Sequence, residues 1–246
     1  MMFSIDEKSD YLKEDIVNIL DKFMREGTVL EEDRNVVKYF DYKGLSLNVK
    51  AFKRPNIINR FAYKYIRPSK AKRSFLYAQK LVNLDIGTPQ PIAFIEKSSL
   101  LGLNDSFYIS RQIDVDYEFR ALLSRDITEI REVLIAFTRF THNMHKKGVY
   151  FIDHSPGNTL IKETSTGYDF YLVDLNRTKF YPEEISLELG IKNFYRLGST
   201  PEMVEVMAKE YAKLRNVDEN HVLSMMMKMT MKHNAAVAIK KAKRNK

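Results

Sequence analysis

The loop Asp153-His154-Ser155-Pro156-Gly157-Asn158 places a carboxylate five positions before an amide, and another carboxylate, Asp174, follows farther along the chain. Phosphoryl transfer needs a carboxylate to orient the attacking hydroxyl. It also needs an amide oxygen and a second carboxylate to hold magnesium, and a cation for the nonreacting phosphates. Kinase catalytic loops have this Asp-to-Asn spacing. The order of residues therefore predicts Asp153 as base, Asn158 and Asp174 as magnesium ligands, and Lys50 as a catalytic residue that contacts phosphate.

Each of these residues also has a purely structural explanation. Asp and Asn beside Pro and Gly commonly shape turns, and a lysine on a strand is commonly solvated. Their joint placement, with a helix, a hinge and a hairpin between them, favours the kinase interpretation.

The first half of the chain has the pattern of an antiparallel sheet with one helix. Leu45, Leu47 and Val49 alternate with polar residues, so Lys50 projects from the face opposite the aliphatic one. Ser69 is a suitable N-cap for the helix. The predicted strands are 28–31, 35–41, 45–52, 92–96 and 106–112, and the predicted helix is 69–84.

The second half is predicted to be mainly helical. Apolar residues share one face of segment 129–146, which predicts a buried central helix that ends at Gly148. Strands at 159–162 and 168–173 form a hairpin between Asn158 and Asp174, and the chain beyond Pro182 is again helical in pattern.

These elements predict an α+β fold of the protein-kinase-like, bilobal type, with a five-stranded antiparallel N-lobe sheet, one helix and a mainly helical C-lobe. Residues 1–112 are the expected nucleotide-binding N-lobe. Residues 113–246 are the expected C-lobe with the catalytic and metal-binding loops, and a hinge is expected at 111–114.

Composition narrows the possible partners and the compartment. Forty Lys and Arg against 32 Asp and Glu give a net charge of +8, which favours anionic partners. The absence of cysteine excludes disulfides and thiolate sites. Neither a signal peptide nor a membrane-spanning run is recognisable, so a cytoplasmic location is expected.

The chain resembles the Kdo/lipopolysaccharide core kinase family between about Gly27 and Phe180. The motifs that carry the resemblance are Asn48-Val49-Lys50, Ser69-Lys70-Ala71, Gly87-Thr88-Pro89-Gln90-Pro91, Asp153 through Asn158, and Asp174-Leu175-Asn176-Arg177. The resemblance implies a bacterial kinase that uses ATP and Mg2+ to phosphorylate a hydroxyl of Kdo or a neighbouring heptose. Its acceptor is then Kdo-lipid A at the inner membrane. Lys50, Gly27 and Arg177 are the nucleotide-binding candidates.

Three positions depart from the kinase pattern. Gly27 is a single glycine where protein kinases carry a phosphate loop with three. Phe151 replaces the histidine two positions before the catalytic Asp, and His154 lies on the other side of it. Leu76 stands where the helix Glu that pairs with Lys50 is expected, unless the helix register is shifted and Leu76 packs against the sheet.

Two further features have open or structural interpretations. His142 and His145 lie three positions apart, but no further His or Cys completes a metal set, so we expect helix packing. Arg177 is predicted either to touch phosphate or to brace the metal loop, and the sequence does not choose between the two.

The short segment 175–181 leaves no room for an activation segment, which disfavours a protein substrate. The alternatives are an antibiotic-type phosphotransferase, a pseudokinase that binds nucleotide without turnover, and a basic nucleic-acid binder. No nucleic-acid motif is present, so we expect no nucleic-acid partner. The sequence leaves the sugar and the oligomeric state open.

Segment 50–73 contains nine Lys or Arg and no acidic residue, with Phe52, Phe61, Tyr63 and Tyr65 among them. This composition suits peripheral contact with an anionic inner membrane, although a solvated loop and helix start would have it too. Five basic residues between Lys240 and Lys246 either add to the attraction or form a disordered tail.

Overall fold

The structure is a computed structural model that describes residues 2–7, 9–32 and 35–244. The chain divides into two compact units, 1–113 and 114–246. Each unit has a hydrophobic core of its own. The division lies within segment 111–114, where the sequence predicts a hinge.

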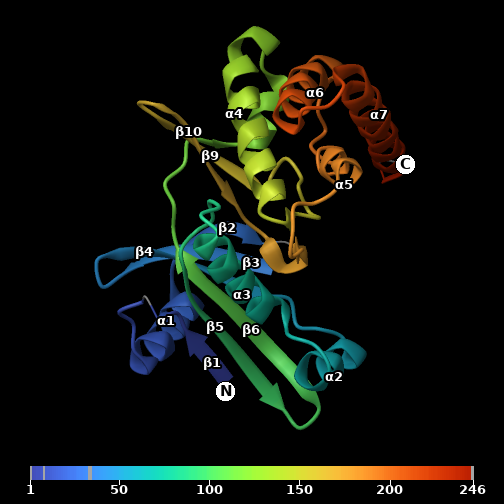
Figure 1. The fold of residues 1–246 in the computed structure, drawn as a ribbon. Coiled ribbons are helices and arrows are strands. Elements are labelled where there is room, and N and C mark those ends of the chain that lie inside the picture. Colours follow the sequence, from blue (N-terminus) through green and yellow to red (C-terminus); the bar gives the residue numbers. More distant parts are fainter. Residues whose placement is uncertain (1, 8, 33–34, 245–246) are drawn as a thin grey trace. The chain divides into compact units, whose positions relative to one another are not determined.

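The first unit is built on a six-stranded antiparallel sheet in the order β1-β5-β6-β4-β3-β2 (Figure 1). The predicted sheet had five strands, so that count is corrected: β1 pairs along the outer edge of β5. The strands are β1 (Met2–Ile5), β2 (Thr28–Glu32), β3 (Asn35–Tyr42), β4 (Leu45–Phe52), β5 (Pro91–Ser99) and β6 (Gly102–Arg111).

The two faces of this sheet pack against different helices. Leu47 and Val49 of β4 belong to the cluster that includes Ile16 and Phe23 of α1 (Lys13–Arg25). On the other face, Phe52 belongs to the cluster formed with α3 (Lys70–Asn83). Lys50 lies on the same face of β4 as Phe52, as its alternation with the aliphatic residues predicts.

Helix α1 was not predicted, and a buried carboxylate ties it to the sheet. Asp15 accepts hydrogen bonds from the Leu12 backbone N–H at 2.9 Å and from the Tyr42 hydroxyl at 2.8 Å. The Lys43 ammonium lies 2.7 Å from the same carboxylate. The bond from Lys43, more than any other contact, lowers the pKa of Asp15 to about 2.

Helix α2 (Ile57–Tyr65) was not predicted either. It begins at Asn56, whose side chain accepts the Asn59 N–H at 3.0 Å, and it contacts β6. Residues 102–104, expected in a loop, form the start of β6 instead.

The second unit is mainly helical, as predicted. Its core surrounds α4, the expected central helix, which ends before Gly148 at a φ of 72°. A Cβ at Gly148 would collide with the Tyr181 carbonyl, so glycine is required there. The helices are α4 (Ile127–Lys146), α5 (Leu187–Lys192), α6 (Pro201–Arg215) and α7 (Glu219–Arg244), with short 3-10 turns at Phe119–Ser124 and Leu175–Arg177.

Two small sheets complete this unit. β9 (Thr159–Thr164) and β10 (Gly167–Leu172) form the predicted hairpin, and β7 (Tyr117–Glu118) pairs with β9. β8 (Val149–Tyr150) pairs with β11 (Lys179–Phe180), which brings the chain after residue 174 back beside the chain before residue 153.

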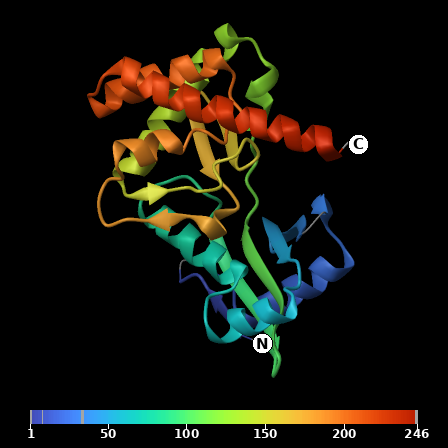
Figure 2. The same cartoon turned by 90° about the vertical axis from the view of Figure 1, so that its right-hand side faces the viewer.

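The basic C-terminal segment is helical as far as Arg244, the last described residue, and so is not a disordered tail there. Figure 2 shows the last turns of α7 extending past α6. Across the described residues, every helix is either too short or too polar to span a bilayer.

Candidate active site

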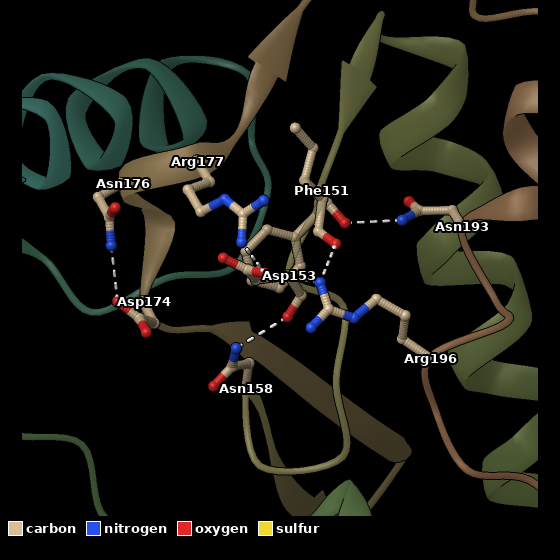
Figure 3. Close-up of polar contacts among 9 residues, drawn as sticks. Phe151, Asp153, Asn158, Asp174, Asn176, Arg177, Asn193 and Arg196 are labelled. Atoms are coloured by element: carbon tan, nitrogen blue, oxygen red, sulfur yellow. Dashed lines mark hydrogen bonds and ion pairs between the residues drawn. The ribbon is translucent and has the colours of Figure 1, made fainter. Parts of the chain in front are cut away.

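The predicted catalytic loop is a chain of tight turns closed by its own amide. The backbone N–H groups of Ser155 and Asn158 donate to the carbonyls of Asp153 and Ser155 at 2.7 and 3.0 Å. The Asn158 side-chain Nδ2 donates to the Asp153 carbonyl at 2.8 Å (Figure 3). The spacing of five positions therefore lets the Asn158 side chain close the loop onto the Asp153 carbonyl.

The hairpin brings Asn158 beside the second carboxylate. Thr159 pairs with Leu172 at the end of the ladder, and the Val173 N–H donates to the Asn158 carbonyl at 3.0 Å. Asp174 follows directly, in the left-handed region at φ 60° and ψ 49°, and the Asn176 Nδ2 donates to its Oδ1 at 2.9 Å. Asp is among the few non-glycine residues that tolerate this conformation.

The carboxylate of Asp153 is held through one oxygen. Arg196 Nη1 donates to Oδ1 at 2.8 Å and Arg177 Nη1 donates to the same oxygen at 3.1 Å, as Figure 3 shows. Arg196 also donates to the Ile152 carbonyl at 3.3 Å. Among the described residues nothing bonds Oδ2, so this oxygen can accept a proton from a hydroxyl.

A buried polar chain supports the loop from behind. Asn193 Nδ2 donates to the Phe151 carbonyl at 2.7 Å, and the Asn193 Oδ1 lies 2.8 Å from His145 Nε2. Because an amide oxygen only accepts, Nε2 carries the proton and Nδ1 accepts from the Tyr211 hydroxyl at 2.9 Å. Burial lowers the pKa of His145 to about 3, so it is neutral.

The histidine pair is therefore structural, as predicted. His145 is fully buried and committed to Tyr211 and Asn193, while His142 faces Glu184 at 3.9 Å.

His154 fills an apolar position behind the loop. Its ring centroid lies 5.2 Å from that of Phe137 and 5.5 Å from that of Phe151, and neither ring nitrogen has a hydrogen-bond partner among the described residues. Burial lowers its pKa to about 3, so it too is neutral. Its role here is packing.

The remaining candidates belong to the other unit. Lys50 lies on β4 with its Nζ 5.7 Å from the centroid of Phe52. Leu76 of α3 is 41% exposed, so it does not pack against the sheet as a shifted register would require.

Gly27 directly precedes β2, and residues 33–34, between β2 and β3, lie outside the described residues. Its φ is 105°, and a Cβ there would lie 3.0 Å from the Phe40 ring and 3.3 Å from the Tyr39 carbonyl oxygen. The backbone conformation and these contacts account for a glycine at position 27 even if it does not contact a phosphate.

The donor set of the second unit suits a hard cation. Asn158 uses its Nδ2 on the loop, which leaves Oδ1 as an acceptor, and Asp174 contributes a carboxylate just past the other strand of the hairpin. Oxygen donors with one carboxylate and a substrate phosphate are typical of Mg2+. Throughout the described ranges, no three or more His, Cys, Asp or Glu side chains are grouped so that they could hold a metal ion by themselves.

Sequence reasoning missed Arg196 and Asn193, which contact the loop from the segment after α5. No local pattern in the sequence indicates them, because they approach the loop from a distant segment, where Asn193 adds a second bond to a Phe151 carbonyl that already accepts from the His154 N–H at 3.2 Å.

The fold, but not the sequence, matches known proteins. No protein-family model and no curated protein matches the chain. A solved structure titled WaaP in complex with acyl carrier protein matches with a TM-score of 0.63 at 15% identity, over 94% of this chain and 99% of that one. The Rio2 kinase from Chaetomium thermophilum, as an ADP/Mg2+-phosphoaspartate complex, matches with a TM-score of 0.49 at 11% identity, over 98% and 82%. The likeness to WaaP confirms the predicted protein-kinase-like fold.

Proposed function

We propose that this protein is an ATP-dependent kinase that phosphorylates a sugar hydroxyl of the lipopolysaccharide core, on Kdo or a neighbouring heptose. The observation that carries the proposal is the arrangement of Asp153, Asn158 and Asp174. One loop and one hairpin hold these three side chains together, with a carboxylate oxygen of Asp153 left for a hydroxyl proton.

Each residue has a distinct part in this chemistry. Asp153 orients the acceptor hydroxyl and takes its proton as the oxygen attacks the γ-phosphorus and the bond to the ADP oxygen breaks. Asn158 and Asp174 would hold Mg2+, which neutralises charge on the phosphates when it is bound. We assign Lys50 to the nonreacting phosphates, as a cation on a rigid strand.

Two observations support a sugar of the lipopolysaccharide core as acceptor. The fold matches that of WaaP, and the motifs Asp153 through Asn158 and Asp174-Leu175-Asn176-Arg177 resemble those of the lipopolysaccharide core kinases. The Arg177 guanidinium lies on Asp153 and its side chain is 57% exposed, so a cation is available where the acceptor must approach. An acidic sugar such as Kdo, or a phosphorylated heptose, has the complementary charge.

The test is to incubate the protein with ATP, Mg2+ and purified Kdo-lipid A, and in parallel with a heptosylated acceptor and an aminoglycoside. We expect a product heavier by one phosphate from one of the lipopolysaccharide acceptors. Transfer to the aminoglycoside alone would show an antibiotic-type phosphotransferase. ATP binding without transfer to any acceptor would show a binding module.

A further inference from the structure

Helix α2 turns its apolar side chains away from the unit that carries it. None of its residues is buried, although its sequence is Ile-Ile-Asn-Arg-Phe-Ala-Tyr-Lys-Tyr. Ile58 is 76% exposed and Phe61 is 54% exposed. A helix that served only to cover the sheet would have the opposite orientation, because its apolar stripe would face the core.

The turn between β5 and β6 extends this apolar surface. Leu100 and Leu101, at the tip of the turn, are 91% and 68% exposed. The Tyr65 hydroxyl donates to the Leu100 carbonyl at 3.2 Å, and Lys64 Nζ donates to the Ser99 carbonyl at 2.7 Å. The helix and the turn lie side by side in Figure 1. We call the following residues the apolar patch: Ile57, Ile58, Phe61, Tyr65, Ile66, Leu100 and Leu101.

The polar side of α2 fixes this orientation. Arg60 Nε donates to the Leu103 carbonyl at 3.2 Å, and Arg60 also bonds the side chain of Asn104. The backbone of Arg60 lies so close to Gly102 that a Cβ there would be 2.5 Å from it. The apolar patch therefore lies on a helix that is anchored to the sheet. Rotation of α2 to bury its apolar side chains against the unit would break these contacts.

The charge around the apolar patch has one dominant sign. Segment 53–70 contains six Lys or Arg and no Asp or Glu. Within the part of the chain that the structure describes, Asp105 is the one acid paired with them, 2.9 Å from Arg54. The Arg67 guanidinium carbon lies 4.6 Å from the Tyr63 ring centroid, so a cation stacks on an aromatic ring.

This combination of features favours a lipid surface over solvent or protein. Single exposed apolar residues are ordinary, but a contiguous set marks an interaction site. Surface-lying helices bury an apolar face at headgroup depth and use Lys, Arg and aromatic residues at the same level. A second copy of this chain would bring the same positive charge to the patch, which like-charge repulsion opposes.

We propose that α2 and the β5–β6 turn bind the surface of an anionic phospholipid bilayer, with the apolar patch inserted at headgroup depth. Binding of this kind needs neither ATP nor acceptor. Its use, which is to hold the enzyme at the bilayer that carries the acceptor, rests on the proposed function.

The chain has no tryptophan, so a single introduced tryptophan reports its own surroundings. In the full chain, Phe61→Trp places the reporter in the apolar patch, and Met24→Trp places it on α1 at a side chain that is 72% exposed. With phosphatidylglycerol vesicles we expect a blue shift of emission and quenching by brominated lipid for Phe61→Trp only. Equal shifts at both positions, or none at Phe61→Trp, would overturn the proposal.

Sedimentation with the same vesicles separates the contribution of apolar insertion from that of positive charge. Ile58→Asp with Leu101→Asp should lower the partition coefficient at least about tenfold, since two inserted side chains become charged. Lys53→Gln and Lys70→Gln should each lower it about fivefold, and added salt should do the same. All four side chains are exposed, so melting temperatures should not change.

Two other results would overturn the proposal. Equal binding to neutral phosphatidylcholine vesicles would remove the role of charge. Concentration-dependent dimerisation without lipid, abolished by Ile58→Asp with Leu101→Asp, would assign the apolar patch to a second copy. Neither measurement involves phosphoryl transfer, so failure of the kinase assay leaves this test unaffected.

Discussion

One carboxylate oxygen of Asp153 accepts bonds from two guanidinium groups. This arrangement orients the carboxylate. Arg196 Nη1 and Arg177 Nη1 donate to this oxygen at 2.8 and 3.1 Å, and the two bonds together restrict rotation of the carboxylate. The second oxygen then points in a single direction. A base fixed in this way loses little orientational freedom in the transition state, which is where positioning contributes to rate.

We expect Asp153→Asn to lower kcat by about 10² to 10⁴ and to leave the ATP dissociation constant nearly unchanged, because a base is lost but no phosphate contact is. Transfer of phosphate to Kdo-lipid A and nucleotide titration measure the two quantities. Asp169→Asn, at an exposed residue of the same hairpin, is the matched control. Full activity of Asp153→Asn would show that the base is elsewhere.

Kinetic measurements should distinguish the roles of Arg196 and Arg177. The Arg196 side chain is 30% exposed and also holds the Ile152 carbonyl, so Arg196→Met should misplace the loop and lower kcat about 10- to 100-fold. The Arg177 side chain is 57% exposed, so Arg177→Met should mainly raise KM for an anionic acceptor. A wild-type KM for Arg177→Met would assign Arg177 to bracing alone. Partial rescue of kcat by Arg196→Lys would support a positioning role for Arg196.

The site residues that the sequence predicted in the second unit lie close together along the chain. Asp153 and Asn158 close one loop, and a hairpin returns the chain to Asp174, so spacing alone indicates them. Arg196 and Asn193 reach the loop only because the helices of the second unit pack as they do. No rule of spacing could have selected them.

At the scale of elements, the missed helices lack the usual signals. α1 begins after Leu12, which has no capping side chain, and Asp15 inside the helix supplies the bond instead. α2 has an apolar face with no core opposite it. β1 has four residues and exists by pairing with β5, about 90 positions later. The predicted strands and α3 have clear alternation or a capping serine, and the structure confirms them.

The two buried neutral histidines make the second unit sensitive to acid. Each has a pKa of about 3 when folded and about 6.5 when unfolded, so the unfolded chain binds more protons between these values. The free energy of unfolding should therefore fall as pH drops below about 6.5. At pH 5.5 the two together should cost on the order of 3 kcal/mol. Urea unfolding at pH 7.5 and 5.5 measures this difference.

His154→Leu should remove one of the two contributions. It deletes two unpartnered polar atoms between Phe137 and Phe151, so it should also raise the stability at pH 7. An unchanged pH dependence in His154→Leu would show that other groups cause the acid sensitivity. His145→Leu should instead destabilise at every pH, because it leaves Asn193 and Tyr211 without their partner.

At the scale of the whole molecule, stability is divided between two cores and charge is concentrated at the surface. Each unit buries its own cluster, and among the described residues neither of these two clusters includes the last turns of α7. The C-terminal segment from Lys240 carries five basic residues, a large share of the net charge of +8. The sequence predicts that charge, but only the structure shows that most of the segment is helix.

Removal of residues 236–246 should therefore change charge without changing stability. Asn234 Nδ2 donates to the Ser199 carbonyl at 3.1 Å, and it is the last residue of α7 with such an anchor among those described. Side chains 235–243 are exposed, so their loss uncovers no core. We expect a melting temperature within about 2 °C of the full chain, because surface changes away from packed groups cost within about 0.5 kcal/mol.

The same truncation tests how the basic charge is used. Binding to anionic vesicles should weaken, by up to about fivefold for each charge that lies near the bilayer. The truncated Phe61→Trp protein that still binds vesicles should show the same shift of emission, because insertion occurs through α2 and the β5–β6 turn. A melting temperature lower by several degrees would show that the end of α7 packs against the protein, and a lost emission shift would show that the C-terminal helix is the principal anchor.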